Sequence, residues 1–262
     1  MPANATATSR GRFIWFDLVT SDAAGAISFY TKLVGWEIET WPGEVPYHMW
    51  VANKTAVGGV VALPPGADKS GAGPHWFAHI TTPNADDAVA TATRLGGKVL
   101  TPAKDIPTVG RYAVLADPQG ASFSAYTPDN MPPETEGPVP VGHFMWHELM
   151  TTDAVAAFNF YHTLFGWEHT SEMDMGKDGS YYMYGRRRDG EALGGMYSGA
   201  SPANPKPAWL HYIRVTDVDR SALQVPKLGG KVVRPAMDVP GGSRILVGID
   251  PQGAAFALVS VR

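Results

Sequence analysis

The chain has 262 residues, of which 44% are hydrophobic and 18% are charged, and its formal net charge is −4. This composition is typical of a globular protein with a substantial core, and it lacks both the basic field that nucleic-acid binding needs and any cysteine for disulfides, thiolate metal sites or nucleophilic catalysis. Because no apolar run reaches the roughly 18 residues of a membrane span and the first twelve residues lack an apolar signal-peptide core, we expect a cytoplasmic protein with neither a membrane nor a nucleic-acid partner.

The predicted elements begin after a polar tail, residues 1–12. Residues 13–20 alternate as a strand does, and a helix follows that is capped by Asp22 and ended by Gly35. Further strands are predicted at residues 47–52, 56–63, 75–82, 111–116 and 121–126, and a second helix at 86–95. The order is a strand, a helix and then two or three strands, twice over, which is a repeated βαβββ unit.

The chain also repeats itself on a larger scale. Asp22 recurs as Asp153, 131 positions later, and the sequence DPQGA at residues 117–121 recurs at 250–254, 133 positions later. So many identities at a nearly constant spacing indicate two copies of one module. The modules are predicted at residues 13–127 and 142–262, joined by a Pro-rich linker at 128–141.

Three motifs occur in both copies: W-x-[DE]-L-x-T-x-D, from Trp15 to Asp22 and from Trp146 to Asp153, F-Y-x₄-G-W in the first helix, and DPQGA. On these motifs the chain resembles the vicinal oxygen chelate superfamily, which includes glyoxalases, bleomycin-resistance proteins and extradiol dioxygenases. Within it, the chain is most similar to two-module glyoxalase-like proteins of actinobacteria. The resemblance implies an α+β fold in which the paired βαβββ units of each module form a curved mixed sheet around a cavity.

Metal-using members of that superfamily carry one ligand, typically His or Glu, on each of four strands of the cavity. The matching positions here hold Trp15 and Trp146, Phe77 and Leu210, Ser124 and Ala257, and residues near Gly59 and Gly195. None of these side chains is a plausible ligand for a divalent metal. We therefore predict no metal and no cofactor, with a divalent metal held by other residues as the alternative.

Strand alternation turns a second set of side chains toward the predicted cavity. Asp17 and His79 occupy pseudo-equivalent positions of the two half-modules, so the internal two-fold relation would bring them face to face. A carboxylate that orients an imidazole can set a general base or a hydrogen-bonding clamp near neutral pH. Glu148 and Tyr212 form the same pair in the second module. The alternative is that both pairs are buried, mutually satisfied and purely structural.

The remaining candidates line the cavity or its rim. Trp15 and Trp146 can stack on a flat ligand or plug an unused cavity. The other predicted ligand-binding residues are Phe77, Ser122, Ser124 and Leu210, with Arg111 and Arg244 supplying charge. The glycine pairs at residues 58–59 and 194–195 lie within strands, where they indicate bulges or close backbone approaches.

These residues predict a protein that binds a small metabolite, flat or carbonyl-bearing, without a metal. The rival interpretation is a lyase, isomerase or hydroxylase/dioxygenase-like enzyme that acts on an α-oxo or aromatic substrate, with Asp17 and Glu148 as bases or with a divalent metal. A third is a scaffold whose cavities are plugged. The predicted assembly is a monomer of two packed modules or a homodimer.

Overall fold

The computed structural model describes residues 10–42, 46–64, 66, 73–134, 137–176, 179–200 and 206–261. Residues 1–9 of the predicted tail and 135–136 of the predicted linker lie outside the described residues. None of the helices in the described ranges is both long enough and apolar enough to cross a bilayer.

In the residues that the structure describes, the first module has two helices and eight strands. Its elements are β1 (Phe13–Thr20), α2 (Ala23–Val34), β2 (Glu37–Trp41), β3 (Tyr47–Ala52), β4 (Thr55–Ala62), β5 (His75–Thr81), α3 (Ala85–Arg94), β6 (Lys98–Ile106), β7 (Gly110–Ala116) and β8 (Ser122–Pro128). The strands form one mixed sheet in the order β2-β3-β4-β1-β5-β8-β7-β6.

The second module repeats this series. Its elements are β9 (Phe144–Met150), α4 (Ala154–Phe165), β10 (Glu168–Asp174), β11 (Ser180–Gly185), β12 (Ala192–Tyr197), β13 (Ala208–Arg214), α5 (Val218–Gln224), the short 3₁₀ helix η3 (Pro226–Leu228), β14 (Lys231–Asp238), β15 (Ser243–Ile249) and β16 (Ala255–Val261). Its sheet has the matching order β10-β11-β12-β9-β13-β16-β15-β14. The predicted α+β class and the tandem repeat are confirmed.

The sequence pattern missed the strands at the sheet edges. β2 and β6, and their counterparts β10 and β14, end each strand order, and most of their side chains are exposed. An exposed edge strand needs no alternating apolar residues, so it leaves little periodicity to detect. Pro102 and Pro235 lie inside β6 and β14, where the pairing register shifts, as expected of edge strands.

The predicted helix boundaries are confirmed by their caps. The Asp22 carboxylate accepts a hydrogen bond from the Gly25 amide, which begins α2, and Gly35 ends it with φ 85°. In α4, Asp153 and Gly166 take the same roles, with φ 70° at the glycine. A left-handed residue at the end of a helix favours glycine, because a side chain there is strained.

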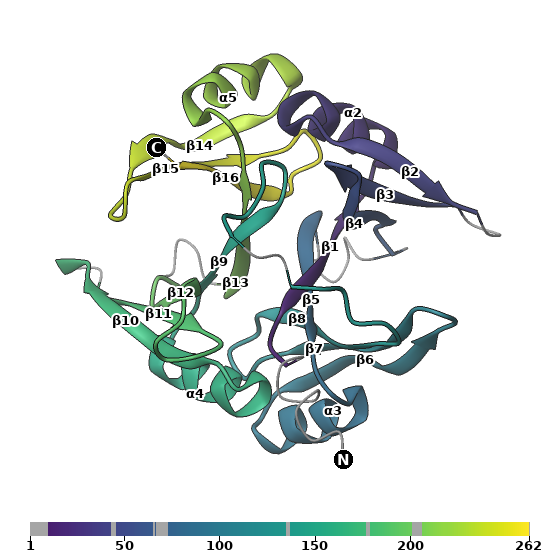
Figure 1. The fold of residues 1–262 in the computed structure, drawn as a ribbon, viewed down its shortest axis with the longest axis vertical. Helices are drawn as coiled ribbons and strands as arrows, with labels where there is room; N and C mark the ends of the chain where they lie inside the picture. The colour runs from purple at the N-terminus through teal and green to yellow at the C-terminus, as the bar shows by residue number, and fades with distance from the viewer. Residues whose placement is uncertain are drawn as a thin grey trace. The chain divides into compact units, whose positions relative to one another are not determined.

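Each compact unit of the structure combines half of each module. One unit contains Met1–Ile14, Ala78–Glu134 and His147–Trp209, and the other contains Trp15–Phe77, Thr135–Trp146 and Leu210–Arg262. In Figure 1, α2 of the first module accordingly lies beside the end of the chain that carries α5 and β14–β16. A helix from one module therefore covers strands of the other.

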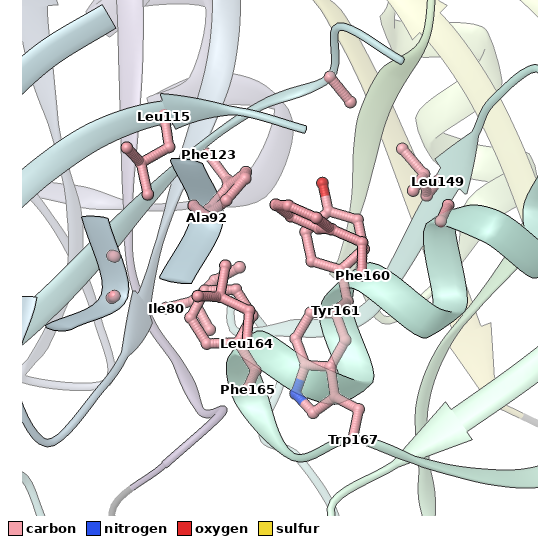
Figure 2. Close-up of a cluster of buried hydrophobic side chains, with 14 of the residues drawn as sticks. Ile80, Ala92, Leu115, Phe123, Leu149, Phe160, Tyr161, Leu164, Phe165 and Trp167 are labelled. Atoms are coloured by element: carbon pink, nitrogen blue, oxygen red, sulfur yellow. The ribbon is translucent and has the colours of Figure 1, made fainter. Parts of the chain in front are cut away.

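The core of the first unit shows this exchange in its side chains (Figure 2). Ile80, Leu115 and Phe123 come from first-module strands, and Phe160 and Phe165 come from α4 of the second module. The Phe123 ring lies 6.1 Å from Phe160 and 5.6 Å from Phe165, edge to face in both cases. Because burial of such rings is a major stabilising term, each unit depends on both modules.

The repeated DPQGA turns anchor these exchanged helices. The buried Asp117 carboxylate accepts three backbone N–H groups of its own turn and a 3.0 Å hydrogen bond from Tyr161 of α4. In the other unit, Asp250 receives a 3.1 Å bond from Tyr30 of α2. Burial raises the pKa of both carboxyl groups above the ordinary value, although the hydrogen bonds act in the opposite direction.

Candidate functional site

A hydrogen-bonded group of three side chains occupies the half-buried face of β1 and the start of β3. The Tyr47 hydroxyl donates to Asp17 Oδ1 at 2.5 Å. The Trp15 indole N–H lies 2.8 Å from the Tyr47 oxygen and 3.1 Å from the same Asp17 oxygen. All three side chains are half-buried. Trp15 and Asp17 are therefore brought together, as the alternation of β1 predicts.

The second module repeats the acid–tyrosine pair. The Tyr181 hydroxyl donates to Glu148 Oε2 at 2.9 Å. Tyr181 is the second residue of β11, the counterpart of β3, which Tyr47 begins, and Glu148 occupies on β9 the position of Asp17 on β1. The hydrogen bond between tyrosine and carboxylate is therefore present in both modules, although the acid is Asp17 in the first and Glu148 in the second.

Two glycines make room for the tyrosine rings. A Cβ on Gly59 would lie 2.0 Å from the Tyr47 hydroxyl oxygen, and one on Gly195 would lie 1.9 Å from the Tyr181 ring. Both distances are far below any van der Waals contact, so these positions require glycine. The predicted close backbone approach is found at Gly58 and Gly194, where a Cβ would lie 1.9 Å from the Phe16 carbonyl oxygen and 1.8 Å from the His147 carbonyl oxygen. At Gly59 and Gly195 the close neighbour is a tyrosine side chain instead.

The tyrosines are the site residues that the sequence interpretation missed. A signal existed, because Tyr47 and Tyr181 both begin the pattern Tyr-x-Met-aromatic at the repeat spacing. Burial raises the pKa of the Tyr47 hydroxyl well above its ordinary value, and the neighbouring Asp17 carboxylate raises it further. Tyr47 therefore stays protonated and acts as a hydrogen-bond donor, not as a base.

The predicted pairings of Asp17 with His79 and of Glu148 with Tyr212 stay predictions, because the members of each pair belong to different compact units. His79 is buried, and its ring lies 5.9 Å from each of the Tyr112 and Tyr126 rings, edge to face. His79 is paired in register with Ser124 on the neighbouring strand β8, where Ser122 lies two residues earlier.

The matching half of the second module is apolar. Tyr212 belongs to a buried cluster with Ile245, Ala257 and Val259, and Trp146 and Leu210 pack against it. Trp146 therefore covers an apolar surface of its own unit. Phe77, also a predicted ligand-binding residue, is buried and makes an edge contact with His75 at 6.3 Å.

The two predicted arginines bind carboxylates outside this group of residues. The Arg111 guanidinium donates to both oxygens of Asp86, at 2.8 and 2.9 Å, and to Asp105 at 2.9 Å. Arg244 makes the equivalent bonds to Asp219 and Asp238. Each arginine thus joins a helix start to an edge strand, which accounts for its recurrence in both modules.

The donor set does not fit a resident metal ion. In the parts of the chain that the structure describes, no three His, Asp or Glu side chains are grouped closely enough to hold one. At the positions that the family resemblance matches to metal ligands, the chain holds an indole at Trp15 and Trp146 and a hydroxyl or methyl group at Ser124 and Ala257. Such groups are poor divalent-metal ligands.

Comparison with known proteins gives one family and several relatives. The model of the Glyoxalase/Bleomycin resistance protein/Dioxygenase superfamily matches residues 12–124 and again 141–258. "Putative glyoxylase CFP32" of Mycobacterium bovis is 33% identical over 253 residues, covering 94% of this chain and 93% of the relative. "Anthracycline biosynthesis protein DauV" of Streptomyces sp. (strain C5) is 31% identical over 260 residues, covering 95% and 92%.

A solved structure shares the fold at lower identity. The Mn(II)-bound glyoxalase from Novosphingobium aromaticivorans superposes with a TM-score of 0.64 at 14% identity. The superposition covers 96% of this chain and 83% of that one. At this identity the likeness extends to the fold alone.

Proposed function

From the premise that this chain belongs to the Glyoxalase/Bleomycin resistance protein/Dioxygenase superfamily, we propose that it binds a small metabolite, flat or carbonyl-bearing, without a resident metal. Side chains that stack on the ligand or form hydrogen bonds with it would hold it in place of a metal ion and its ligating residues. The observation that carries the proposal is the acid–tyrosine pair, which recurs in both modules although the acid differs.

The chemistry of the Trp15–Asp17–Tyr47 group suits such a ligand. The indole of Trp15 offers a flat apolar face, on which an aromatic ring can stack. A carbonyl oxygen could accept the hydrogen bond that Tyr47 now gives to Asp17, and a phenol or amine of the ligand could donate to the carboxylate instead. The name of the Streptomyces relative, which refers to anthracycline biosynthesis, supports a flat aromatic ligand.

Binding of a neutral aromatic ketone tests this proposal directly. With 9-fluorenone as the probe, we expect tryptophan quenching that saturates, and an affinity about tenfold lower in Tyr47→Phe and in Asp17→Asn. Glu37→Gln, an acid-to-amide change at an exposed residue of β2, is the matched control and should bind like the parent. Equal affinities in all four proteins, or near-stoichiometric metal in the purified protein, would contradict the proposal.

A second candidate function is catalysis at the same pair. Asp17 Oδ1 accepts hydrogen bonds from the Tyr47 hydroxyl and the Trp15 indole, and these bonds hold the carboxylate in one orientation, as a general base requires. In this alternative, Asp17 and Glu148 remove a proton from an α-oxo or aromatic substrate. The double variant Asp17→Asn/Glu148→Gln should then have no turnover of an α-oxo or aromatic substrate that the parent converts. Unchanged turnover in this variant would show that the two acids are not the catalytic bases.

A further inference from the structure

The second half of the first module's sheet has one apolar face and one polar face. Ile80, Leu115 and Phe123 point into the core of the unit. The residues next to these three in the chain point to the opposite face of the sheet. A residue that pairs in register with one of those neighbours lies on that same opposite face. We call this opposite face the polar face. It carries His79 on β5, Ser124 and Tyr126 on β8, Tyr112 on β7 and Lys104 on β6.

Three aromatic side chains of the polar face are held in place. The His79 ring makes edge contacts with Tyr112 and Tyr126, each at 5.9 Å. The Tyr126 hydroxyl donates to the Val109 carbonyl at 2.8 Å. The Lys104 ammonium lies 5.1 Å from the centre of the Tyr112 ring, within the range of a cation–π contact. The face therefore presents rigid rings with a positive charge at one end.

Ser124 supplies the observation that points to a ligand. Its side chain is fully buried, with 0% exposure, and its hydroxyl has no hydrogen-bond partner in the described part of the chain. Leaving a buried hydroxyl unpaired costs about 1–3 kcal/mol. A bound molecule that supplies the missing partner would recover this free energy.

The second module shows that the fold does not need these polar groups. The same five positions there hold Tyr212, Ala257, Val259, Ile245 and Met237. Their strand register is the same, with Tyr212 beside Ala257 and Met237 beside Ile245. Ala257 stands in place of Ser124, and Met237 stands in place of Lys104. Tyr212, Ile245, Ala257 and Val259 form a buried apolar cluster. The polar set is therefore a property of the first module alone.

We propose that the polar face of the first module, which lies within one compact unit, binds a flat aromatic acid of one or two rings. Its anion lies at Lys104, its rings lie against Tyr112 and Tyr126, and an acceptor atom meets the Ser124 hydroxyl. Ser124 and Lys104 lie two strands apart and are offset by two residues along β7. With about 4.8 Å between strands and about 3.4 Å per residue, their backbones are about 12 Å apart, a span that a two-ring acid and the Lys104 side chain can bridge. This inference goes beyond the proposed function, because it assigns a separate binding surface with its own class of ligand to residues of one compact unit.

The test compares a charged probe with its neutral isostere, 2-naphthoate with 2-naphthamide, by titration calorimetry on the full chain. We expect one naphthoate per chain and weaker binding of the amide. Lys104→Met, which copies the second module, should weaken naphthoate about tenfold and leave the amide unchanged. Met237→Lys is the matched change in the other module and should alter neither affinity.

Ser124→Ala separates a binding role from a structural one. Removing an unpartnered buried hydroxyl should leave the unfolding temperature unchanged or raise it, while the affinity for naphthoate falls. Ala257→Ser is its counterpart in the second module and should not increase binding. An affinity for naphthoate that is unchanged in both Lys104→Met and Ser124→Ala, two sites per chain, or no naphthoate binding at millimolar concentration would each overturn the inference.

These outcomes differ from those that test the proposed function. If 9-fluorenone binds in a Tyr47-dependent way but naphthoate binds no better than its amide, the proposed function stands and the assignment of an acidic ligand fails. If the ketone does not bind and naphthoate still depends on Lys104, the polar face is a site and the role of the acid–tyrosine pair is wrong.

Discussion

At the scale of single residues, the best-defined feature is the contact between a glycine and a tyrosine that holds each acid–tyrosine pair. Gly59→Ala would place a methyl group on the Tyr47 ring and force it away from Asp17. We expect a loss of about 1–3 kcal/mol in the free energy of unfolding, measured by urea denaturation, together with weaker ketone binding. Gly73→Ala, where a Cβ meets nothing within 4 Å, is the control. Equal stability of the two variants would contradict the contact.

His211 gives the protein a predictable response to acid. Burial lowers the pKa of His211 to about 3, whereas the unfolded chain has an ordinary value near 6.5. Above about pH 6.5, His211 is neutral in both the folded and the unfolded chain and does not lower the free energy of unfolding. As the pH falls toward 3, protons bind His211 in the unfolded chain alone, so the free energy of unfolding decreases. By pH 5 the loss is about 2 kcal/mol. His211→Phe should remove this part of the pH dependence, and His75→Gln, a change in a half-buried histidine at the start of β5, should not.

Denaturation of these two variants and the parent at pH 7.5 and pH 5 measures the difference. The reasoning depends on the surroundings of His211, whose ring lies 5.1 Å from Phe16 and 6.5 Å from Phe144. If the parent and His211→Phe lose equal stability between the two pH values, the histidine is charged in the folded protein and the argument fails.

At the scale of elements, the two DPQGA turns have diverged in how they hold the start of the opposite helix. Gln119 Nε2 donates to the Asp153 carbonyl at 2.8 Å, and its Oε1 accepts from the Asp153 amide at 2.6 Å and from the Thr151 hydroxyl at 2.8 Å. The Oε1 of its counterpart Gln252 has no hydrogen-bond partner in the ranges that the structure describes.

This divergence predicts unequal effects of the same substitution. Gln119→Ala removes several hydrogen bonds at the β9–α4 junction and should lower the free energy of unfolding by about 2–3 kcal/mol. Gln252→Ala should cost less than about 1 kcal/mol. Chemical denaturation of the two variants compares them directly, and a larger cost at Gln252 would contradict the assignment.

Sequence patterns predicted the helices and the strands with a buried face, but they missed the exposed strands at the edges of the sheets. The helix caps at Asp22 and Gly35 follow from local backbone chemistry, so they were predictable. β2 and β6 were missed because they are exposed. Of the site, the shared face of Trp15 and Asp17 was predictable from alternation. Tyr47 was not singled out, since its local sequence does not show which carboxylate it meets.

At the scale of the whole molecule, the exchange of helices and strands between modules has a consequence for folding. Each compact unit takes half of its chain from each module, and its buried rings come from both, as Phe123 and Phe160 show. A single module would leave these apolar surfaces exposed to water.

We therefore expect that fragments 1–134 and 135–262, expressed separately, do not fold as monomers. Circular dichroism and sedimentation should show unfolded chains or self-associated ones, in which a second copy takes the place of the missing module. Co-expression of the two fragments should restore cooperative unfolding. A monomeric fragment that unfolds cooperatively by itself would show that the exchange is not needed for stability.

The sequence by itself determined what depends on short-range spacing: the duplication, the caps, the strands with a buried face and the family resemblance. Only the tertiary structure decided that helices pack on the opposite module, that Tyr47 and Tyr181 bind the acids, and that Arg111 and Arg244 bind surface carboxylates. The reason is that such contacts join residues far apart in the chain, and local periodicity specifies the face of an element but not its partner.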